Sequence, residues 1–349
     1  MTALIGPTHV LCSIGNGTDQ VWAAARAGIG RITSSHVMNQ HLEPIQMGLV
    51  PEAALGTLAE EIDSLPLSSR ARRILRLAAP SFQMVAQDLA QPVSLFIGLP
   101  ALTPAEAPWL TRVPAYLHTL TGIPIDRATS ATFPSGRAAA LIALERALSA
   151  LEANPTAPVV VGGVDSYLDL RALGTLDIER RLLGTHVMDG LIPGEGAAFF
   201  VLSSAGGPGG NTERIVVNAA ASIMDPGHRY ADAPARGEGL AVALEAIRER
   251  AGQLPAPIGT TFAGFNGESF ESKLWGVARM RHGDLFSPGM VLDHPADKFG
   301  DTGAATGAIL MALAAKALAS GTRPGPALVW AASDREPRAC AVVSAASGT

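Results

Sequence analysis

Two stretches of this chain carry the same order of elements: SATFPSGRAAALIALERALSALEANPTAPVVVGG at 130–163 and GDTGAATGAILMALAAKALASGTRPGPALVWAA at 300–332. Each contains a turn of small residues, a helix of about 15 residues and a short strand rich in β-branched side chains. Thr132 in the first stretch and Asp301 in the second each lie 28 positions before a strand valine. We infer that the fold is duplicated and that a functional site lies where the two halves meet.

The composition is that of a well-packed globular protein. Of the 349 residues, 48% are hydrophobic, 16% are charged and 5% are aromatic. These fractions predict a core built mainly from Ala, Val, Leu and Gly. The formal net charge of −5 gives no excess of basic side chains for phosphate backbones, so nucleic acid is not an expected partner.

The cysteines, histidines and apolar runs limit the class of protein further. Cys12 and Cys340 are too far apart in sequence to indicate a disulfide framework or a metal-binding pair. No two histidines have the i, i+4 spacing of a zinc site, so we expect neither a metal nor another cofactor. The longest apolar helical run, 303–315, is too short to cross a bilayer. These features predict a cytoplasmic chain without a membrane span.

Predicted strands alternate with predicted helices, which indicates an α/β fold with a mostly parallel sheet, built twice. A polar stretch at 34–55 is expected to lie outside the sheet. The Gly- and Pro-rich segment 203–213 predicts a linker, so we place the N-terminal half at 1–205 and the C-terminal half at 206–349. The other expected strands are 3–13, 93–98, 197–202, 214–221, 260–265 and 339–344. The other expected helices are 18–27, 70–89 and 237–252, and Thr18 is the expected cap of the first.

Three segments resemble the β-ketoacyl-acyl-carrier-protein synthases of the thiolase superfamily. They are GNGTDQVWAAARAGIGRI at 15–32, PVVVGGVDS at 158–166 and DGLIPGEGAAFFVL at 189–202. The last segment is the most specific, because the D-G-x-x-x-G-E-G-A run of the family is long and ordered. The resemblance implies the thiolase-like fold, a five-layered αβαβα body from two duplicated halves with mostly parallel or mixed sheets, usually as a homodimer.

The resemblance also implies three catalytic positions. Family members carry an acyl group on a cysteine at the N-terminus of a buried helix, where the helix dipole and backbone N–H groups lower the thiol pKa. Two histidines from the second half polarise the donor carbonyl. The positions that match the cysteine and the two histidines are Thr132, Asn266 and Asp301.

Thr132 matches the cysteine because the segment Ala131–Gly136 resembles the A-C-x-x-G/S run of the family. An alkanol is a far weaker acid than a thiol, so a helix terminus alone does not activate it. A threonine nucleophile needs a base within hydrogen-bond reach. Thr132 is therefore either an activated acyl acceptor or simply the N-cap of the following helix.

Asn266 and Asp301 replace the imidazoles with groups of different chemistry. The Asn266 amide can donate a hydrogen bond to an oxyanion but cannot shuttle protons; alternatively it is a turn residue before Gly267. A carboxylate at Asp301 would repel a developing enolate unless burial keeps it protonated. Asp301 is alternatively the N-cap of a helix over 302–319.

Four further residues are assigned to substrate binding: Phe133, Arg137, Glu268 and Lys298. Arg137 is expected either to pair with Asp301 or to be a solvated helix residue. Lys298 stands three positions before Asp301, whereas the elongating synthases place a lysine five positions before. Glu195 in the matched PGEGA run is expected to support the backbone.

Two functions remain open from the sequence. In the first, the chain is a synthase-like protein that does not catalyse decarboxylative condensation and acts as a subunit binding an acyl group, acyl-CoA or an acyl-carrier protein. It would form a homodimer or pair with a homologue. In the second, it is an acyltransferase in which Thr132 accepts the acyl group, Asn266 stabilises the oxyanion and Asp301 is the base. The first agrees with the replaced gating loop, because SDREPR at 333–338 stands where elongating members have G-F-G-G-x-N.

Overall fold

The computed structural model describes residues 3–89, 92–101, 103, 107–204, 215–232 and 235–346. The linker expected at 203–213 lies outside the described residues from 205 onward, and so does the proposed boundary between the halves. Within the described part of the chain, no helix combines the length and hydropathy needed to span a bilayer.

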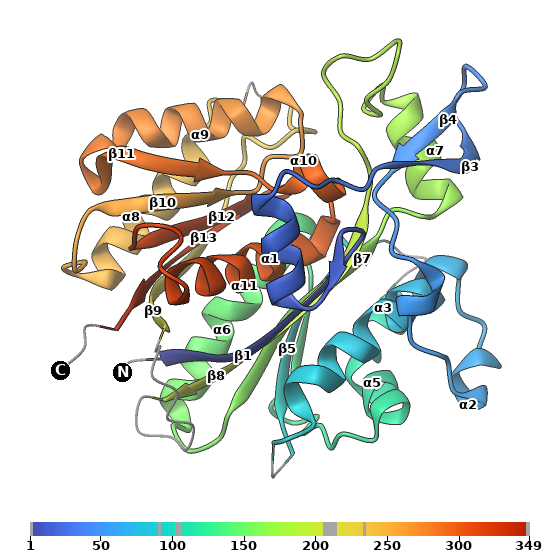
Figure 1. Cartoon of the computed structure of the whole chain (residues 1–349), viewed down its shortest axis with the longest axis horizontal. Coiled ribbons are helices and arrows are strands. Elements are labelled where there is room, and N and C mark those ends of the chain that lie inside the picture. The colour runs from blue at the N-terminus through green and yellow to red at the C-terminus, as the bar shows by residue number, and fades with distance from the viewer. Residues whose placement is uncertain are drawn as a thin grey trace.

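One 11-stranded mixed sheet forms the body of the molecule (Figure 1). Its strands are β1 (Ala3–Cys12), β2 (Gly15–Asn16), β5 (Ser94–Leu99), β6 (Ala131–Pro134), β7 (Val159–Ser166), β8 (Glu195–Ser204), β9 (Ile215–Met224), β10 (Ile258–Ala263), β11 (Phe286–Asp293), β12 (Ala327–Ala332) and β13 (Pro337–Ala345). The order is β11-β10-β12-β13-β9-β1-β8-β7-β5-β6, with β2 beside β1. A separate pair, β3 (Thr33–Met38) and β4 (Pro44–Met47), confirms that the segment 34–55 lies outside this sheet.

The two halves of the sheet repeat one pairing pattern, which confirms the duplication. From the middle outward, β1-β8-β7 and β9-β13-β12 are antiparallel, and β7-β5-β6 and β12-β10-β11 are parallel. The halves join where β1 pairs with β9. The expectation of a mostly parallel sheet is wrong, because the short turn after β12 returns the chain antiparallel as β13.

Helices separate and cover the two halves. They are α1 (Thr18–Arg26), α2 (Glu60–Asp63), α3 (Ser69–Ala86), α4 (Ala107–Leu110), α5 (Val113–Thr121), α6 (Ala139–Ala153), α7 (Leu170–Ile178), α8 (Glu238–Ala251), α9 (Ser269–Arg281), α10 (Ala296–Phe299) and α11 (Thr306–Ala319). The central α6 and α11 contact strands of both halves, α3 and α5 cover the first half, and α8 and α9 cover the second. This arrangement confirms the five-layered αβαβα fold.

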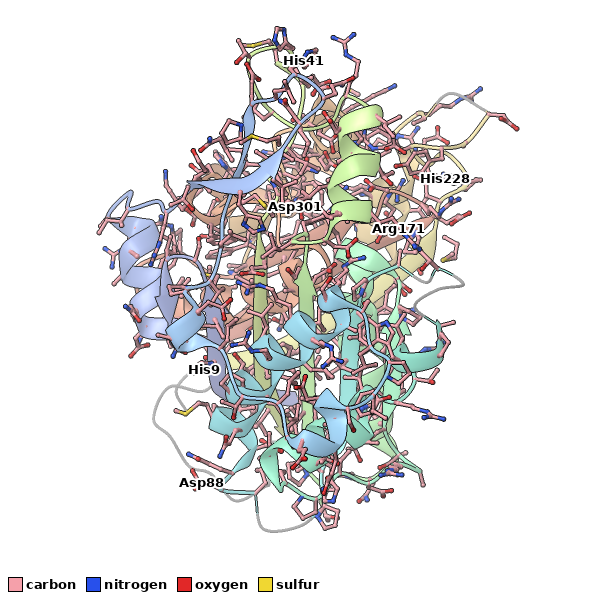
Figure 2. All side chains as sticks on the ribbon, turned by 90° about the vertical axis from the view of Figure 1, so that its right-hand side faces the viewer. His9, His41, Asp88, Arg171, His228 and Asp301 are labelled. Atoms are coloured by element: carbon pink, nitrogen blue, oxygen red, sulfur yellow. The ribbon has the colours of Figure 1, made fainter. Side chains whose placement is uncertain are left out.

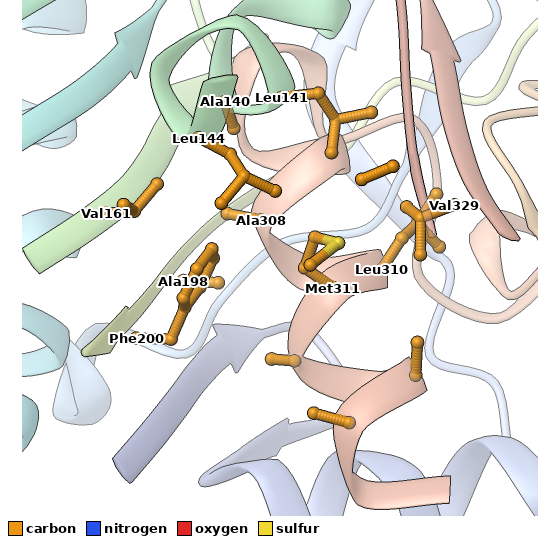
Figure 3. Close-up of a cluster of buried hydrophobic side chains, with 14 of the residues drawn as sticks. Ala140, Leu141, Leu144, Val161, Ala198, Phe200, Ala308, Leu310, Met311 and Val329 are labelled. Atoms are coloured by element: carbon orange, nitrogen blue, oxygen red, sulfur yellow. The ribbon is translucent and has the colours of Figure 1, made fainter. Parts of the chain in front are cut away.

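The central layer is built from small and aliphatic residues. Twelve of the 14 residues of α11 are buried, as a helix surrounded by protein requires. Figure 3 shows Ala140 and Leu144 of α6 beside Ala308 and Met311 of α11. A Cβ at Gly307 would lie 2.9 Å from Leu141 Cγ. Small side chains therefore let the two helices approach each other closely.

The predicted cap of the first helix is wrong by one residue. Gly17, with φ 124°, is the N-cap of α1, and Thr18 is its first residue. Thr18 Oγ1 instead lies 2.9 Å from Thr8 Oγ1 on β1. The left-handed backbone needed at the N-cap favours glycine over threonine.

Candidate functional site

Two short 3-10 turns lead into the central helices and show how the duplicated units correspond. The turns begin at Gly136 and Gly303, whose φ values are 72° and 53°. These glycines are 167 positions apart, whereas Thr132 and Asp301 are 169 positions apart. When the two turns are superposed on their glycines, Asp301 corresponds to the residue two positions after Thr132. Thr132 is therefore not the counterpart of Asp301.

Thr132 lies on β6, at the edge of the sheet, beside Ile97 of β5. The N-cap of α6 is Ala138, so the expectation that Thr132 caps this helix is wrong. Among the described residues, no hydrogen bond joins the Thr132 hydroxyl to Asn266 or Asp301. Phe133 stacks on Phe96, with ring centroids 6.3 Å apart. Neither Thr132 nor Phe133 is part of the polar site described next.

Arg137 joins the two halves through buried hydrogen bonds. Its Nε donates to the Ala332 carbonyl at 3.0 Å, and its Nη1 donates to Asp301 Oδ2 at 2.8 Å. Nη2 donates to Glu271 at 2.7 Å and to Asp334 at 2.8 Å. Only 3% of the Arg137 side chain is exposed. Of the two alternatives from the sequence, pairing with Asp301 is the one observed.

Asn266 follows β10 and contacts the same carboxylate. Its Nδ2 donates to Asp301 Oδ2 at 3.2 Å and to Glu268 Oε2 at 2.8 Å. Its Oδ1 accepts a hydrogen bond from the Glu268 N–H at 3.0 Å. Gly267, with φ 108°, makes this tight turn possible. Asn266 is therefore both a turn residue and a direct neighbour of Asp301.

Asp301 caps a 3-10 turn and pairs with Arg137 at the same time. Its Oδ1 accepts from the Gly303 N–H at 2.8 Å, while the N-cap of α11 is Ala305. We expected Asp301 to be the N-cap of a helix that begins at Thr302. The helix α11 begins later, at Thr306, and Asp301 precedes it by the short 3-10 turn. The side chain has no carboxylate oxygen free of protein donors.

A second arginine, Arg181, extends this cluster. Its guanidinium makes a bidentate pair with Glu268, at 2.8 and 2.7 Å, and donates to both oxygens of Asp334 at 2.9 and 3.0 Å. Arg229 lies 3.0 Å from Glu268. We call the following side chains the ion network: Arg137, Arg181, Arg229, Asn266, Glu268, Glu271, Asp301 and Asp334.

Charges in the ion network nearly balance. Although burial opposes it, Asp334, Asp301 and Glu271 raise the pKa of Arg137 well above its usual value. Burial would raise the pKa of Asp334, but Arg137 and Arg181 hold it well below its usual range. Burial raises the pKa of Glu271 to about 7, against the opposing effect of Arg137. Three guanidinium groups therefore face four carboxyl groups, one of which titrates near neutral pH.

Glu271 should make stability depend on pH. The native carboxyl group keeps its proton up to about pH 7, whereas the unfolded one releases it near pH 4.3. Its contribution to stability is present below the unfolded pKa and is lost as pH rises through the native pKa. Wild-type protein should therefore lose roughly 1 kcal/mol per pH unit between pH 5 and 7 relative to Glu271→Gln, which stays neutral.

Urea unfolding of both proteins at pH 5, 6, 7 and 8 measures this difference. Asp334 stays ionised over the whole range, because its pKa is lowered, and so does not contribute to the slope. Parallel stability curves for the two proteins would contradict the assignment.

Glu268, Glu271 and Asp334 have carboxylate oxygens within 4.8 Å of one another. Arg137, Arg181 and Arg229 already neutralise this acidic group. A divalent cation would have to displace these guanidinium groups, so the donor set fits an ion-pair cluster rather than a metal centre.

The remaining predicted residues lie elsewhere. Glu195 is fully buried and accepts from the Val50 N–H at 2.8 Å, from the Ser166 hydroxyl at 2.7 Å and from Arg73 Nε at 2.7 Å. These contacts agree with a supporting role for Glu195. Lys298 Nζ lies 2.9 Å from Asp297, and Lys298 lines a separate surface cavity of about 130 Å³.

A cavity of about 860 Å³ opens beside the ion network. Arg137 and Asp334 line it, together with one face of α7 and, from the second half, Tyr230 and the segment 333–335. Figure 2 labels Arg171 near the beginning of α7 and Asp301 in the interior. The cavity lies between the halves, as the duplication suggested.

Comparisons with solved structures identify the fold. No protein-family model matches the sequence, and no curated protein matches it. An oxazolomycin ketosynthase domain from Streptomyces albus JA3453 superposes with a TM-score of 0.78 at 15% identity, covering 100% of this chain and 76% of that chain. The chain has the ketosynthase fold. At this identity the likeness shows the fold and assigns no residue roles.

Two further matches to this ketosynthase fold are structures of complexes. One is a ketosynthase (ApeO) with its chain length factor (ApeC) from Xenorhabdus doucetiae, with a TM-score of 0.76, 15% identity, and coverage of 99% of this chain and 98% of that chain. The other is a type II polyketide synthase acyl-carrier protein with its hexaketide-bound ketosynthase, with a TM-score of 0.77, 14% identity and 99% coverage of both chains.

Sequence reasoning missed part of the site in this ketosynthase-fold chain. It placed Asn266, Glu268 and Asp301 correctly beside one another and left the position of Arg137 open. It did not select Arg181 or Asp334, and it left Glu271 open as either part of an altered site wall or part of a capped helix start. Signals were present, because Glu271 follows the Asn266 turn by a few residues and Asp334 lies in the replaced gating loop, but charged residues near turns are usually solvated.

Proposed function

We propose that this ketosynthase-fold chain is a non-condensing accessory subunit that works with an acyl-carrier protein and a second synthase-like chain. One observation carries the proposal. Asp301, which matches one of the family histidines, is held by Arg137 and by Asn266, and Arg137 also binds Glu271 and Asp334. A carboxylate bound in this way is not available as the base that a threonine nucleophile needs.

The cysteines of the chain support this proposal. Burial raises the pKa of Cys12 to about 12 and that of Cys340 still higher. Both thiols are free and buried, on β1 and β13. Reactive cysteines are partly exposed and have lowered pKa values, so neither residue fits an acyl acceptor. Free thiols also agree with an expected cytoplasmic location.

The geometry favours this function over the acyltransferase alternative. A threonine nucleophile needs a base at about 2.6–3.2 Å. Within the described residues the Thr132 hydroxyl makes no hydrogen bond, and Asp301 is bound to Arg137 and Asn266 instead.

Intact-mass measurement after incubation with acyl-CoA and with acyl-carrier protein tests this function. We expect no covalent adduct on the wild-type chain, and no carbon dioxide release from malonyl-carrier protein. A catalytic ketosynthase treated in parallel shows that the reagents are competent. An adduct on wild-type protein that is absent from Thr132→Ala would establish the acyltransferase instead.

The edge strand β6 is the proposed site of pairing with a second chain. Among the strands that the structure describes, it is the last of the sheet, and β5 is the one strand that pairs with it. All four residues of β6 are half-buried, and a strand with one unpaired edge is a template for another strand. The partner is either a second copy or a synthase homologue, as in the solved ketosynthase with its chain length factor.

Light scattering coupled to size-exclusion chromatography tests this pairing. We expect the chain alone, or mixed with a synthase homologue, to elute as a dimer. Thr132→Lys on β6 should convert the dimer to monomers, because it places a charge on the edge strand. Thr119→Lys on the exposed face of α5 is the matched control. Dimerisation that survives Thr132→Lys would place the interface elsewhere.

A further inference from the structure

The large cavity beside the ion network has walls that do not suit a hydrocarbon chain. Its lining includes five arginines, four carboxyl side chains and two tyrosines, but only two large aliphatic residues, Leu170 and Leu176. An apolar chain placed there would remove water from charged groups without replacing their hydrogen bonds, which is costly. A volume of about 860 Å³ is within the usual range for small-molecule sites.

Two of the lining arginines have no carboxylate partner. Arg171 lies on α7 in the first half, and Arg335 lies in the turn between β12 and β13 in the second. Neither guanidinium makes an ion pair or a side-chain hydrogen bond with any residue that the structure describes. Arg335 only stacks over the Tyr230 ring, 5.4 Å from its centroid. The cavity thus has one exposed guanidinium from each half that is not paired with a carboxylate of the described residues.

Two further carboxylates of the cavity wall, Asp169 and Glu179, are already bound by protein donors. Asp169 accepts hydrogen bonds from the backbone N–H groups of Arg171 and Ala172, both at 3.0 Å. Glu179 accepts from the Tyr230 hydroxyl at 2.8 Å. Within the described residues, neither carboxylate forms an ion pair with Arg171 or Arg335.

Tyr167 adds a neutral hydrogen-bond donor to the cavity wall. Burial, together with the charge of Asp301, raises the pKa of Tyr167 well above its usual value, so its hydroxyl stays protonated. Within the described residues this hydroxyl has no hydrogen-bond partner. A ligand with acceptor oxygens would satisfy it.

We propose that this cavity binds a small polyanion, carrying two or more carboxylate or phosphate groups, between Arg171 and Arg335. Guanidinium groups recognise both kinds of anion through paired N–H donors. This inference rests on the proposed function and deepens it. It names the class of ligand that a non-condensing subunit would hold there.

Isothermal titration calorimetry of the full chain at about 0.15 M salt, where exposed charges are screened, tests the inference. The probes are citrate for carboxylates, fructose 1,6-bisphosphate for phosphates, and decanoate for a hydrocarbon chain. We expect one of the two polyanions to bind with one site per chain and decanoate not to bind. Which polyanion binds distinguishes the two sources of charge.

Variants of the two arginines locate the binding site. Arg171→Gln and Arg335→Gln should each weaken binding about tenfold, because each removes a charged hydrogen bond. Arg171→Lys should retain part of the affinity, and Arg112→Gln, at an exposed position on another face, should have no effect. Thermal unfolding of each apo variant shows whether it is folded.

Three outcomes would overturn the inference: neither polyanion binds, decanoate binds more tightly than both, or a polyanion binds equally to wild type and Arg171→Gln. None of these outcomes contradicts the non-condensing function, because the intact-mass measurement tests that function separately. An acyl adduct, conversely, would overturn the function whatever the anion measurements show.

Discussion

Replacing Arg137 with methionine should lower the free energy of unfolding by about 3–5 kcal/mol, the usual cost of removing one partner from a buried ion pair. The side chain is 3% exposed and donates to Asp301, Glu271 and Asp334. Methionine has a similar length but no donors, so two buried carboxylates and one partly exposed one would lose their shared cation. Chemical denaturation at pH 8 measures the loss.

Matched variants separate charge from packing. Arg146→Met, at an exposed position on α6, the helix that follows the turn of Arg137, should change stability by less than about 0.5 kcal/mol. The loss at Arg137 should be smaller at pH 5 than at pH 8, because protonated Glu271 needs no counter-ion. Adding Glu271→Gln to Arg137→Met should therefore recover part of the loss at pH 8. A loss below about 1 kcal/mol for Arg137→Met would contradict the central place of Arg137 in the ion network.

The network also shows why the halves of this chain belong together. Arg137 and Arg181 come from the first half, whereas Asn266, Asp301 and Asp334 come from the second. The ion pairs of Arg137 with Asp301 and of Arg181 with Glu268 form only when both halves are folded and docked. The ion network thus stabilises the association of the two halves.

Most of the fold could be predicted from the sequence because buried strands of this fold are short, continuous apolar runs. The runs at 93–98, 159–163 and 197–202 all lie in strands of the first half. The strand β11 was missed, because Pro288 and Gly289 interrupt its apolar pattern, as is common at a sheet edge. Strand direction was predicted poorly, since an apolar run carries no information about the direction of its neighbour.

Sequence motifs located Asn266 and Asp301, whereas the equal spacing of the two duplicated stretches paired Asp301 with Thr132, which lies outside the ion network. Asn266 and Asp301 were found from turns after a strand and before a helix. The match of Thr132 to Asp301 failed because the units differ in detail: α6 has 15 residues and α11 has 14, and the loops after them differ in length. Counting back from the strands therefore pairs Asp301 with Thr132, whereas counting from Gly136 and Gly303 pairs it with Pro134, two residues later on the same strand.

Gly48→Ala should destabilise the protein by about 3 kcal/mol or more, because the added Cβ has no space and its neighbour is backbone. A Cβ at Gly48 would lie 1.8 Å from the carbonyl oxygen of Phe299, and one at Gly194 would lie 2.6 Å from the same atom. The two glycines form a bridge with each other. The Gly194 N–H donates to the Asp301 carbonyl at 2.8 Å.

This close approach gives the D-G-x-x-x-G-E-G-A run a structural role in this chain. The run holds the backbone on which Asp301 stands, so alanine at Gly48 should push Asp301 away from Arg137 as well as strain the fold. Gly276→Ala on α9 is the matched control, since no atom lies within 4 Å of its added Cβ; it should stabilise the helix by about 0.5–1 kcal/mol. Thermal or urea unfolding of both variants decides the question, and equal shifts would show that the contact between Gly48 and Phe299 is not a close one.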